Sequence, residues 1–101
     1  MAIINSKAQI GDNCIINTKA LVEHGCIIGD NVNISTNTVL NGDVRVGDSS
    51  FIGSCSVING QLRIGKNAII GSGSVVIKNI DDKCTAVGVP AKIIKKDGKR
   101  I

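Results

Sequence analysis

His24 is the only histidine in the 101-residue chain, and glycines recur at a fixed distance after it. Gly42 and Gly60 stand eighteen and thirty-six residues further on. In a chain that coils with a period of eighteen residues, both glycines lie beside the imidazole and leave a groove next to it. Imidazole is the side chain that titrates near neutral pH, so it can take a proton from an attacking amine or hydroxyl. The spacing therefore makes His24 a candidate general base.

An unbroken six-residue repeat supplies the scaffold for this groove. Every sixth residue is aliphatic, in the column Ile4, Ile10, Ile16, Val22, Ile28, Ile34, Leu40, Val46, Ile52, Ile58, Ile64, Ile70 and Val76. A second column, four places further on, is mostly small from Ala8 to Ser74, with Leu62 and Ile80 as exceptions. Large and small inward positions that alternate in this way are typical of a parallel β-helix.

Three hexapeptides make one coil, because the run Ile10-Gly11-Asp12-Asn13 returns in related form at 28–31, 46–49 and 64–67. We predict an all-β triangular prism of about four 18-residue coils, stacked about 4.8 Å apart. The third and fourth places of each hexapeptide form the corners, and the last of these corners is Lys78-Asn79. The β-helix is expected over residues 1–81, followed by a closing segment and basic tail over residues 82–101.

Composition excludes several functions. The net charge of +4 is concentrated near the C-terminus, but a single aromatic residue, Phe51, argues against nucleic-acid binding. The four cysteines lack CxxC spacing and only one histidine accompanies them, so no metal site is expected. We expect reduced cysteines in a cytoplasmic protein, with no signal peptide and no membrane span.

Two sides of the prism are expected to be apolar on the outside, because neighbours on a strand point to opposite faces. One side presents Leu21, Val39, Val57 and Val75. The next presents Ile15, Asn33, Phe51 and Ile69, whereas the remaining side carries Gln9, Ile27, Arg45, Arg63 and Asp81. A contiguous exposed apolar surface usually marks an interface, and we predict a homotrimer.

Four motifs carry a resemblance to a known family: Asn17-Thr18-Lys19-Ala20-Leu21-Val22-Glu23-His24, Asn41-Gly42-Asp43-Val44, Ile70-Gly71-Ser72-Gly73-Ser74-Val75-Val76 and Gly88-Val89-Pro90-Ala91-Lys92. Together they resemble the left-handed β-helix acyltransferases with hexapeptide repeats. The most similar branch is the bacterial sugar O- and N-acetyltransferases of the sialic acid and bacillosamine type. The resemblance implies that the prism winds in the left-handed sense.

The resemblance also implies an activity, which is transfer of an acetyl group from acetyl-CoA to an amine or hydroxyl of a sugar or nucleotide-sugar. In that family the active site lies between two subunits of a trimer, and the histidine matching His24 is the general base. The family's cofactor contacts match Asn33, Gly42, Ser54 and Ser72 in this sequence. Its Pro-Ala motif, here Pro90-Ala91-Lys92, lies along the pantetheine arm.

Departures from the family pattern favour a second interpretation. Relatives follow the catalytic histidine with Asp or Glu, where this chain has Gly25, and Asn33 replaces a second histidine. The small N-terminal α/β domain of the branch is also missing from this sequence. The alternative is a non-catalytic trimeric scaffold, or a truncated fragment that has lost activity. If the enzyme interpretation holds, Gly25→Asp should raise the rate, provided that the corner accepts a side chain.

Overall fold

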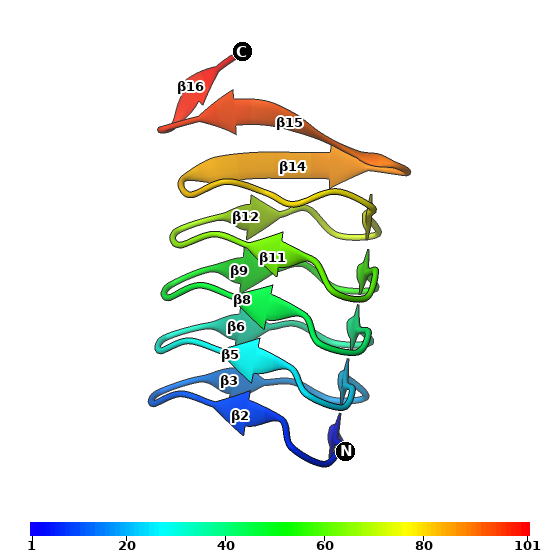
Figure 1. The fold of residues 1–101 in the computed structure, drawn as a ribbon. Coiled ribbons are helices and arrows are strands. Elements are labelled where there is room, and N and C mark those ends of the chain that lie inside the picture. The colour runs from blue at the N-terminus through cyan, green and yellow to red at the C-terminus, as the bar shows by residue number, and fades with distance from the viewer.

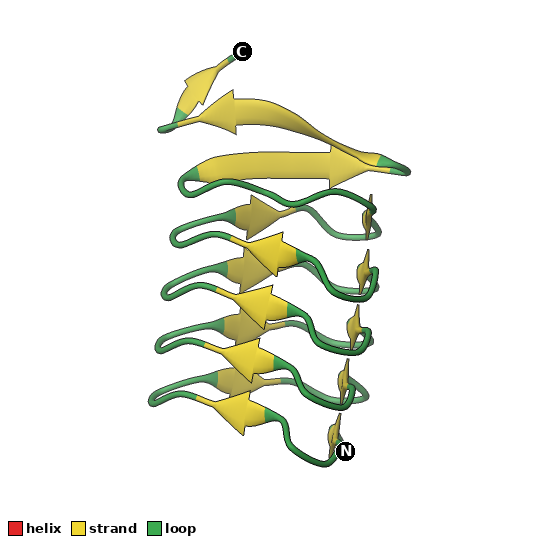
Figure 2. Ribbon diagram, in the orientation of Figure 1, coloured by secondary structure: helices red, strands yellow, loops and turns green.

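The computed structural model describes residues 1–101 and contains short strands and no helix, hence no helix that could cross a membrane (Figure 2). Each strand of the repeat is two residues long, one outward and one inward, and the other four residues of the hexapeptide form the corner. The chain therefore turns at every hexapeptide, and three hexapeptides return it to the same side of the prism.

Strands eighteen residues apart stack into three parallel sheets, the faces of the prism. The first face contains β1 (Ile3–Ile4), β4 (Leu21–Val22), β7 (Val39–Leu40), β10 (Val57–Ile58) and β13 (Val75–Val76). The second face contains β2 (Gln9–Ile10), β5 (Ile27–Ile28), β8 (Arg45–Val46) and β11 (Arg63–Ile64). The third face contains β3 (Ile15–Ile16), β6 (Asn33–Ile34), β9 (Phe51–Ile52), β12 (Ile69–Ile70), β14 (Cys84–Gly88), β15 (Ala91–Lys96) and β16 (Lys99–Arg100).

The winding is left-handed, as the family resemblance implied. In Figure 1 the strands of the second face run from right to left across the front while the chain climbs from the N-terminus at the bottom. The predicted all-β prism with a left-handed winding is therefore confirmed.

The corners form three long edges, which are named here by their side chains. The histidine edge lies between the first and second faces and contains Ser6-Lys7, His24-Gly25, Gly42-Asp43 and Gly60-Gln61. The acidic edge lies between the second and third faces and contains Asp12-Asn13, Asp30-Asn31, Asp48-Ser49, Lys66-Asn67 and Asp82-Lys83. The hydroxyl edge lies between the third and first faces and contains Thr18-Lys19, Thr36-Asn37, Ser54-Cys55 and Ser72-Gly73.

The two inward columns form the core. The aliphatic column is fully buried from Val22 to Val76, whereas Ile4 in the first coil remains 48% exposed because no coil lies beneath it. Polar members of the small column donate to carbonyl oxygens of the next coil, as in Thr38 Oγ1 to Gly53 O (3.0 Å) and Ser56 Oγ to Gly71 O (3.0 Å). The serines and threonine of this column thus satisfy buried corner carbonyls, a role that size alone did not indicate.

The chain turns at the last predicted corner, Lys78-Asn79, but this turn is tighter than the others. Ile80 pairs with Ile64 in parallel, sixteen residues away instead of eighteen, and so takes an inward place on the second face. The next corner falls at Asp82-Lys83 on the acidic edge, where the Asp82 carboxylate accepts the backbone N–H of Lys66 at 2.8 Å. The turn after β13 is two residues shorter than the others, which explains why Ile80 did not fit the small column.

The segment after residue 81 continues the stack before it closes the C-terminal end. β14 pairs with β12 in parallel, and β15 and β16 then fold back in antiparallel order (Figure 1). The division into residues 1–81 and 82–101 stays a prediction. The stack itself has a fifth layer on the third face, beyond the four coils expected.

Candidate active site

His24 occupies an exposed corner between β4 and β5. Its Nδ1 atom lies 3.1 Å from the hydroxyl oxygen of Ser6, which occupies the same corner place one coil below. This is the only hydrogen bond of the imidazole, so Nε2 has no partner within the chain. A ring held at Nδ1 and free at Nε2 has the arrangement that a general base requires.

Glu23, the residue before the histidine, does not contact the imidazole by a hydrogen bond. Its carboxylate accepts the side-chain amide of Asn5, again from the coil below. Asn5 and Ser6 were not singled out from the sequence. Their spacing of eighteen residues from Glu23 and His24 was the available signal, because residues one period apart stack directly.

The corner above His24 is clear of side chains, as the sequence predicted. A Cβ atom built on Gly42 would meet only the His24 carbonyl oxygen, at 3.7 Å, which is an ordinary contact. A Cβ atom on Gly60 would lie 3.3 Å from the Gly42 carbonyl oxygen. At these two third places of the corners above His24, the histidine edge therefore has no side chain.

Gly25 leaves no room for the carboxylate that relatives carry beside the histidine. Its φ of +75° is in the left-handed region, and a Cβ atom there would collide with the Asp43 carboxylate of the next coil. A side chain at this corner is strained by its backbone as well as by the clash. The condition attached to Gly25→Asp is thus not met, and the variant is expected to destabilise the corner instead of raising the rate.

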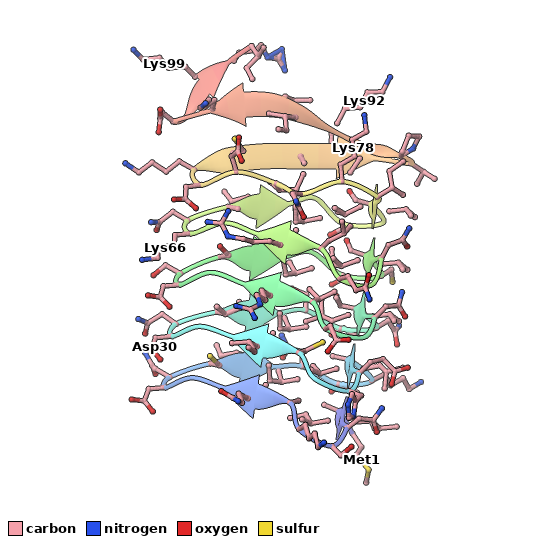
Figure 3. The ribbon with its side chains drawn as sticks, in the orientation of Figure 1. Met1, Asp30, Lys66, Lys78, Lys92 and Lys99 are labelled. Carbon is pink, nitrogen blue, oxygen red and sulfur yellow. The ribbon has the colours of Figure 1, made fainter.

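The other predicted site residues lie away from His24. Ser54 and Ser72 are neighbours on the hydroxyl edge, and Asn33 lies on the third face in β6. Pro90 lies in the turn between β14 and β15, and Ala91 and Lys92 are the first residues of β15. Figure 3 shows Lys92 near the C-terminal end. Only Gly42 shares the edge of His24, because the whole first face separates that edge from the serines. One chain therefore does not bring the predicted set together.

Asn33 has an unsatisfied polar atom. Its Oδ1 is buried and has no hydrogen-bond partner, although the residue lies between Ile15 and Phe51 on an outer face. An amide left without a partner usually awaits water, a ligand or another chain. The third face thus offers one polar group within an apolar surface.

No cavity of the single chain includes His24. The larger hollow, of about 610 Å³, is open and lies at the C-terminal end, lined by Asn67, Ile69, Lys83, Thr85, Asp97 and Gly98. No group of three His, Cys, Asp or Glu side chains could hold a metal ion. The histidine edge is a surface feature, and a partner surface would have to cover it to make a closed site.

A family model described as the GMPPB C-terminal domain matches residues 1–99. The chain belongs to this family. Among curated proteins, none matches it significantly.

Solved structures of acetyltransferases share this prism. A mutant of perosamine N-acetyltransferase from Caulobacter crescentus, in complex with CoA and GDP-perosamine, is 38% identical with a TM-score of 0.90, over 91% of this chain and 44% of that one. The acetyltransferase domain of PglB from Neisseria gonorrhoeae is 30% identical with a TM-score of 0.84, over 91% and 54%. Soybean serine acetyltransferase is 34% identical with a TM-score of 0.85, over 90% and 42%.

These neighbours confirm the resemblance to hexapeptide-repeat left-handed β-helix acetyltransferases. The chain spans about half the length of the solved structures that it matches.

Proposed function

We propose that this protein transfers an acetyl group from acetyl-CoA to an amine or hydroxyl of a sugar or nucleotide-sugar. The observation that carries the proposal is the histidine edge, where His24 is held at Nδ1, free at Nε2 and bordered by Gly42 and Gly60. The perosamine N-acetyltransferase neighbour, which is bound to CoA and GDP-perosamine, supports the choice of both substrates.

In this mechanism His24 Nε2 takes the proton of the acceptor as the acceptor nitrogen or oxygen attacks. Acetyl-CoA supplies the thioester carbonyl; its carbon forms the new bond to the acceptor while the bond to sulfur breaks. The imidazolium then returns its proton to the departing thiolate, so that His24 ends neutral. Proton transfer by a positioned side chain contributes about 10²–10⁴-fold to such reactions.

The residues of this chain fit acetyl-CoA as a co-substrate. The backbone-lined corner at Gly42 admits a narrow chain, and the buried amide oxygen of Asn33 lacks a partner. Ser54 and Ser72 offer hydroxyls on one edge. Lys92 extends from the C-terminal end of the prism on the same side of the view as Lys78, where it would attract phosphate (Figure 3). We assign Pro90 and Ala91 to the same cofactor path.

We further propose that the active site forms between two chains of a homotrimer. His24 lies on the edge opposite the third face, which carries Asn33, so a site that uses both residues needs a second copy. The third face presents Ile15 (54% exposed), Phe51 (41%) and Ile69 (47%), and the first face presents the half-buried column of Leu21, Val39, Val57 and Val75. Packing these two apolar faces against each other around a threefold axis would bring the histidine edge of one copy toward the third face of the next.

The test is titration calorimetry with CoA, followed by mass spectrometry of acetylated amino sugars and nucleotide-linked amino sugars. We expect saturable CoA binding below about 1 mM and a mass gain of one acetyl group on an acceptor. Light scattering of the same sample should give three chains per particle. A folded trimer that neither binds CoA nor acetylates any acceptor would defeat the proposal.

A non-catalytic trimeric scaffold, or a fragment with lost activity, is the second candidate function. Gly25 in place of a carboxylate and Asn33 in place of a histidine favour it, and the matching family is described as a C-terminal domain. The calorimetric titration separates the two, because a scaffold has no use for CoA. A cytoplasmic location and the absence of membrane and nucleic-acid partners stay predictions.

A further inference from the structure

We propose that Ser6 is the positioning residue for His24 and takes the place of the carboxylate that the chain lacks at Gly25. The inference rests on the proposed function for its kinetic consequences, but its structural core concerns the imidazole alone. Ser6 Oγ and His24 Nδ1 are 3.1 Å apart.

The backbone fixes Ser6 beneath the histidine. The Gly25 N–H donates to the Ser6 carbonyl oxygen at 3.3 Å, and the Asn5 N–H donates to the Val22 carbonyl oxygen at 2.9 Å. These two bonds tie the first coil to the second on both sides of the pair. The first coil thus has a use beyond packing, although its core residue Ile4 is half-exposed.

No charged group performs this task instead. The charged side chains of the same edge near His24 are Lys7, Glu23 and Asp43. Glu23 is bound to Asn5, the Asp43 carboxylate lies beside Gly25, and Lys7 makes no ion pair. The hydroxyl of Ser6 is therefore the one group that sets the orientation of the ring.

The direction of this hydrogen bond decides whether His24 can act as a base. When Nδ1–H donates to Ser6 Oγ, the lone pair is on Nε2 and faces away from Ser6. The hydrogen bond at one nitrogen of a histidine fixes which tautomer is present. Without a partner, an imidazole favours the Nε2–H tautomer, which cannot accept a proton at that atom. A hydroxyl can also donate, which would leave the proton on Nε2. In the direction that we propose, Ser6 accepts from Nδ1–H and holds the reactive tautomer without adding a charge.

Nitrogen-15 NMR tests the tautomer directly, because His24 is the only histidine and its ring signals need no assignment. In the full-length protein at about pH 8, we expect Nδ1–H as the major form in the wild type and in Ser6→Thr. Ser6→Ala should change the major form to Nε2–H, and Ser6→Gly provides a second deletion of the hydroxyl. Ser49→Ala, on the acidic edge, is the matched control and should leave the tautomer unchanged. The same tautomer in Ser6→Ala and wild type would overturn the proposal.

The kinetic test separates this inference from the proposed function. Ser6→Ala should lower kcat for acetyl transfer about 3–10-fold, the size of one neutral hydrogen bond, with KM for acetyl-CoA unchanged. Ser6→Thr should restore the rate. In a His24→Ala background the Ser6→Ala change should cost nothing further, and an equal loss there would show that Ser6 acts elsewhere. A wild type without any acetyl transfer would defeat the proposed function, while the NMR result would still decide the role of Ser6.

Discussion

The acidic edge and the histidine edge are built from the same corner, but their side chains are used differently. On the acidic edge backbone N–H groups donate to carboxylates of the next coil, as in Asp12 N to Asp30 Oδ1 and Asp30 N to Asp48 Oδ1, both at 2.8 Å, with a break where Lys66 replaces the carboxylate. Figure 3 shows Asp30 and Lys66 along this edge. On the histidine edge no such ladder forms, because the third places hold Ser6, His24, Gly42 and Gly60.

The contrast shows which corners of a repeat protein can carry catalytic or binding groups. A corner whose carboxylate is already bound by the neighbouring coil has less capacity left for a ligand. A corner that interrupts the repeat leaves a free ring nitrogen and open backbone. Positions that maintain the prism recur every eighteen residues, whereas positions that could serve a substrate depart from that recurrence.

The largest expected effect is that of His24→Ala. Removing the base should lower kcat by about 10²–10⁴-fold, whereas CoA affinity should stay within about twofold, because the imidazole acts on the acceptor proton. Assays of acetyl transfer from acetyl-CoA measure kcat, and titration calorimetry with CoA measures the affinity. If His24→Ala kept full activity, the histidine edge would have no role in the reaction, as we expect for the acidic edge.

Filling the cleared corner should have the next largest effect. Gly42 does not have a positive φ and accepts a Cβ atom at 3.7 Å from the nearest atom, so Gly42→Leu is expected to fold. Its side chain would occupy the space above His24 and should lower kcat/KM by about 10–10²-fold. Gly42→Ala is the matched control, with a much smaller loss. Unchanged kinetics in the leucine variant would mean that no substrate passes this corner.

Most of the fold could be predicted from the sequence because each hexapeptide repeats one local rule. The aliphatic column identified the prism, and the positions of Asn and Gly identified the corners. The shortened turn before Ile80 was missed, although Ile77 is aliphatic at a place that holds Gly, Asn, Ser or Glu in the twelve repeats before it. Its consequence is long-range, a pairing with Ile64, which the local departures at Ile77 and Ile80 do not specify.

The site was harder to predict from the sequence than the fold, although the eighteen-residue period already indicates which residues share an edge. Ser54 is thirty residues from His24, which is not a multiple of eighteen, so the two must lie on different edges. Ser6 is eighteen residues from His24 and therefore stacks beneath it. The rotamers that bring Ser6 Oγ to the imidazole and the Asp43 carboxylate to Gly25 depend on side-chain packing, which the repeat does not specify.

On the acidic edge we expect a cost in stability and none in rate. Asp48→Ala removes the acceptor of the Asp30 N–H and should lower the free energy of unfolding by about 1–2 kcal/mol. Asp12→Ala is the matched control at the bottom of the same edge, where the carboxylate accepts no hydrogen bond from another coil. Urea denaturation and acetyl-transfer assays of both variants test the contrast, which fails if Asp48→Ala slows catalysis while leaving stability unchanged.

The smallest expected effect concerns the buried thiol of Cys26, which lies next to the histidine edge. Cys26 Sγ donates to the Asn41 carbonyl oxygen at 3.1 Å, and burial raises the pKa of this thiol above its ordinary value. The folded state therefore keeps a proton that the unfolded chain releases in alkaline solution. Stability is complete below the ordinary thiol pKa of about 8.5 and falls as pH rises from there, by at most about 1.4 kcal/mol per pH unit for one group.

Urea denaturation at about pH 7 and pH 10 under reducing conditions measures this fall. Cys26→Ala should weaken the alkaline loss, whereas Cys55→Ala should not, because Cys55 is exposed in both states. An equal alkaline loss of stability in wild type and Cys26→Ala would show that ionisation of the Cys26 thiol is not coupled to folding.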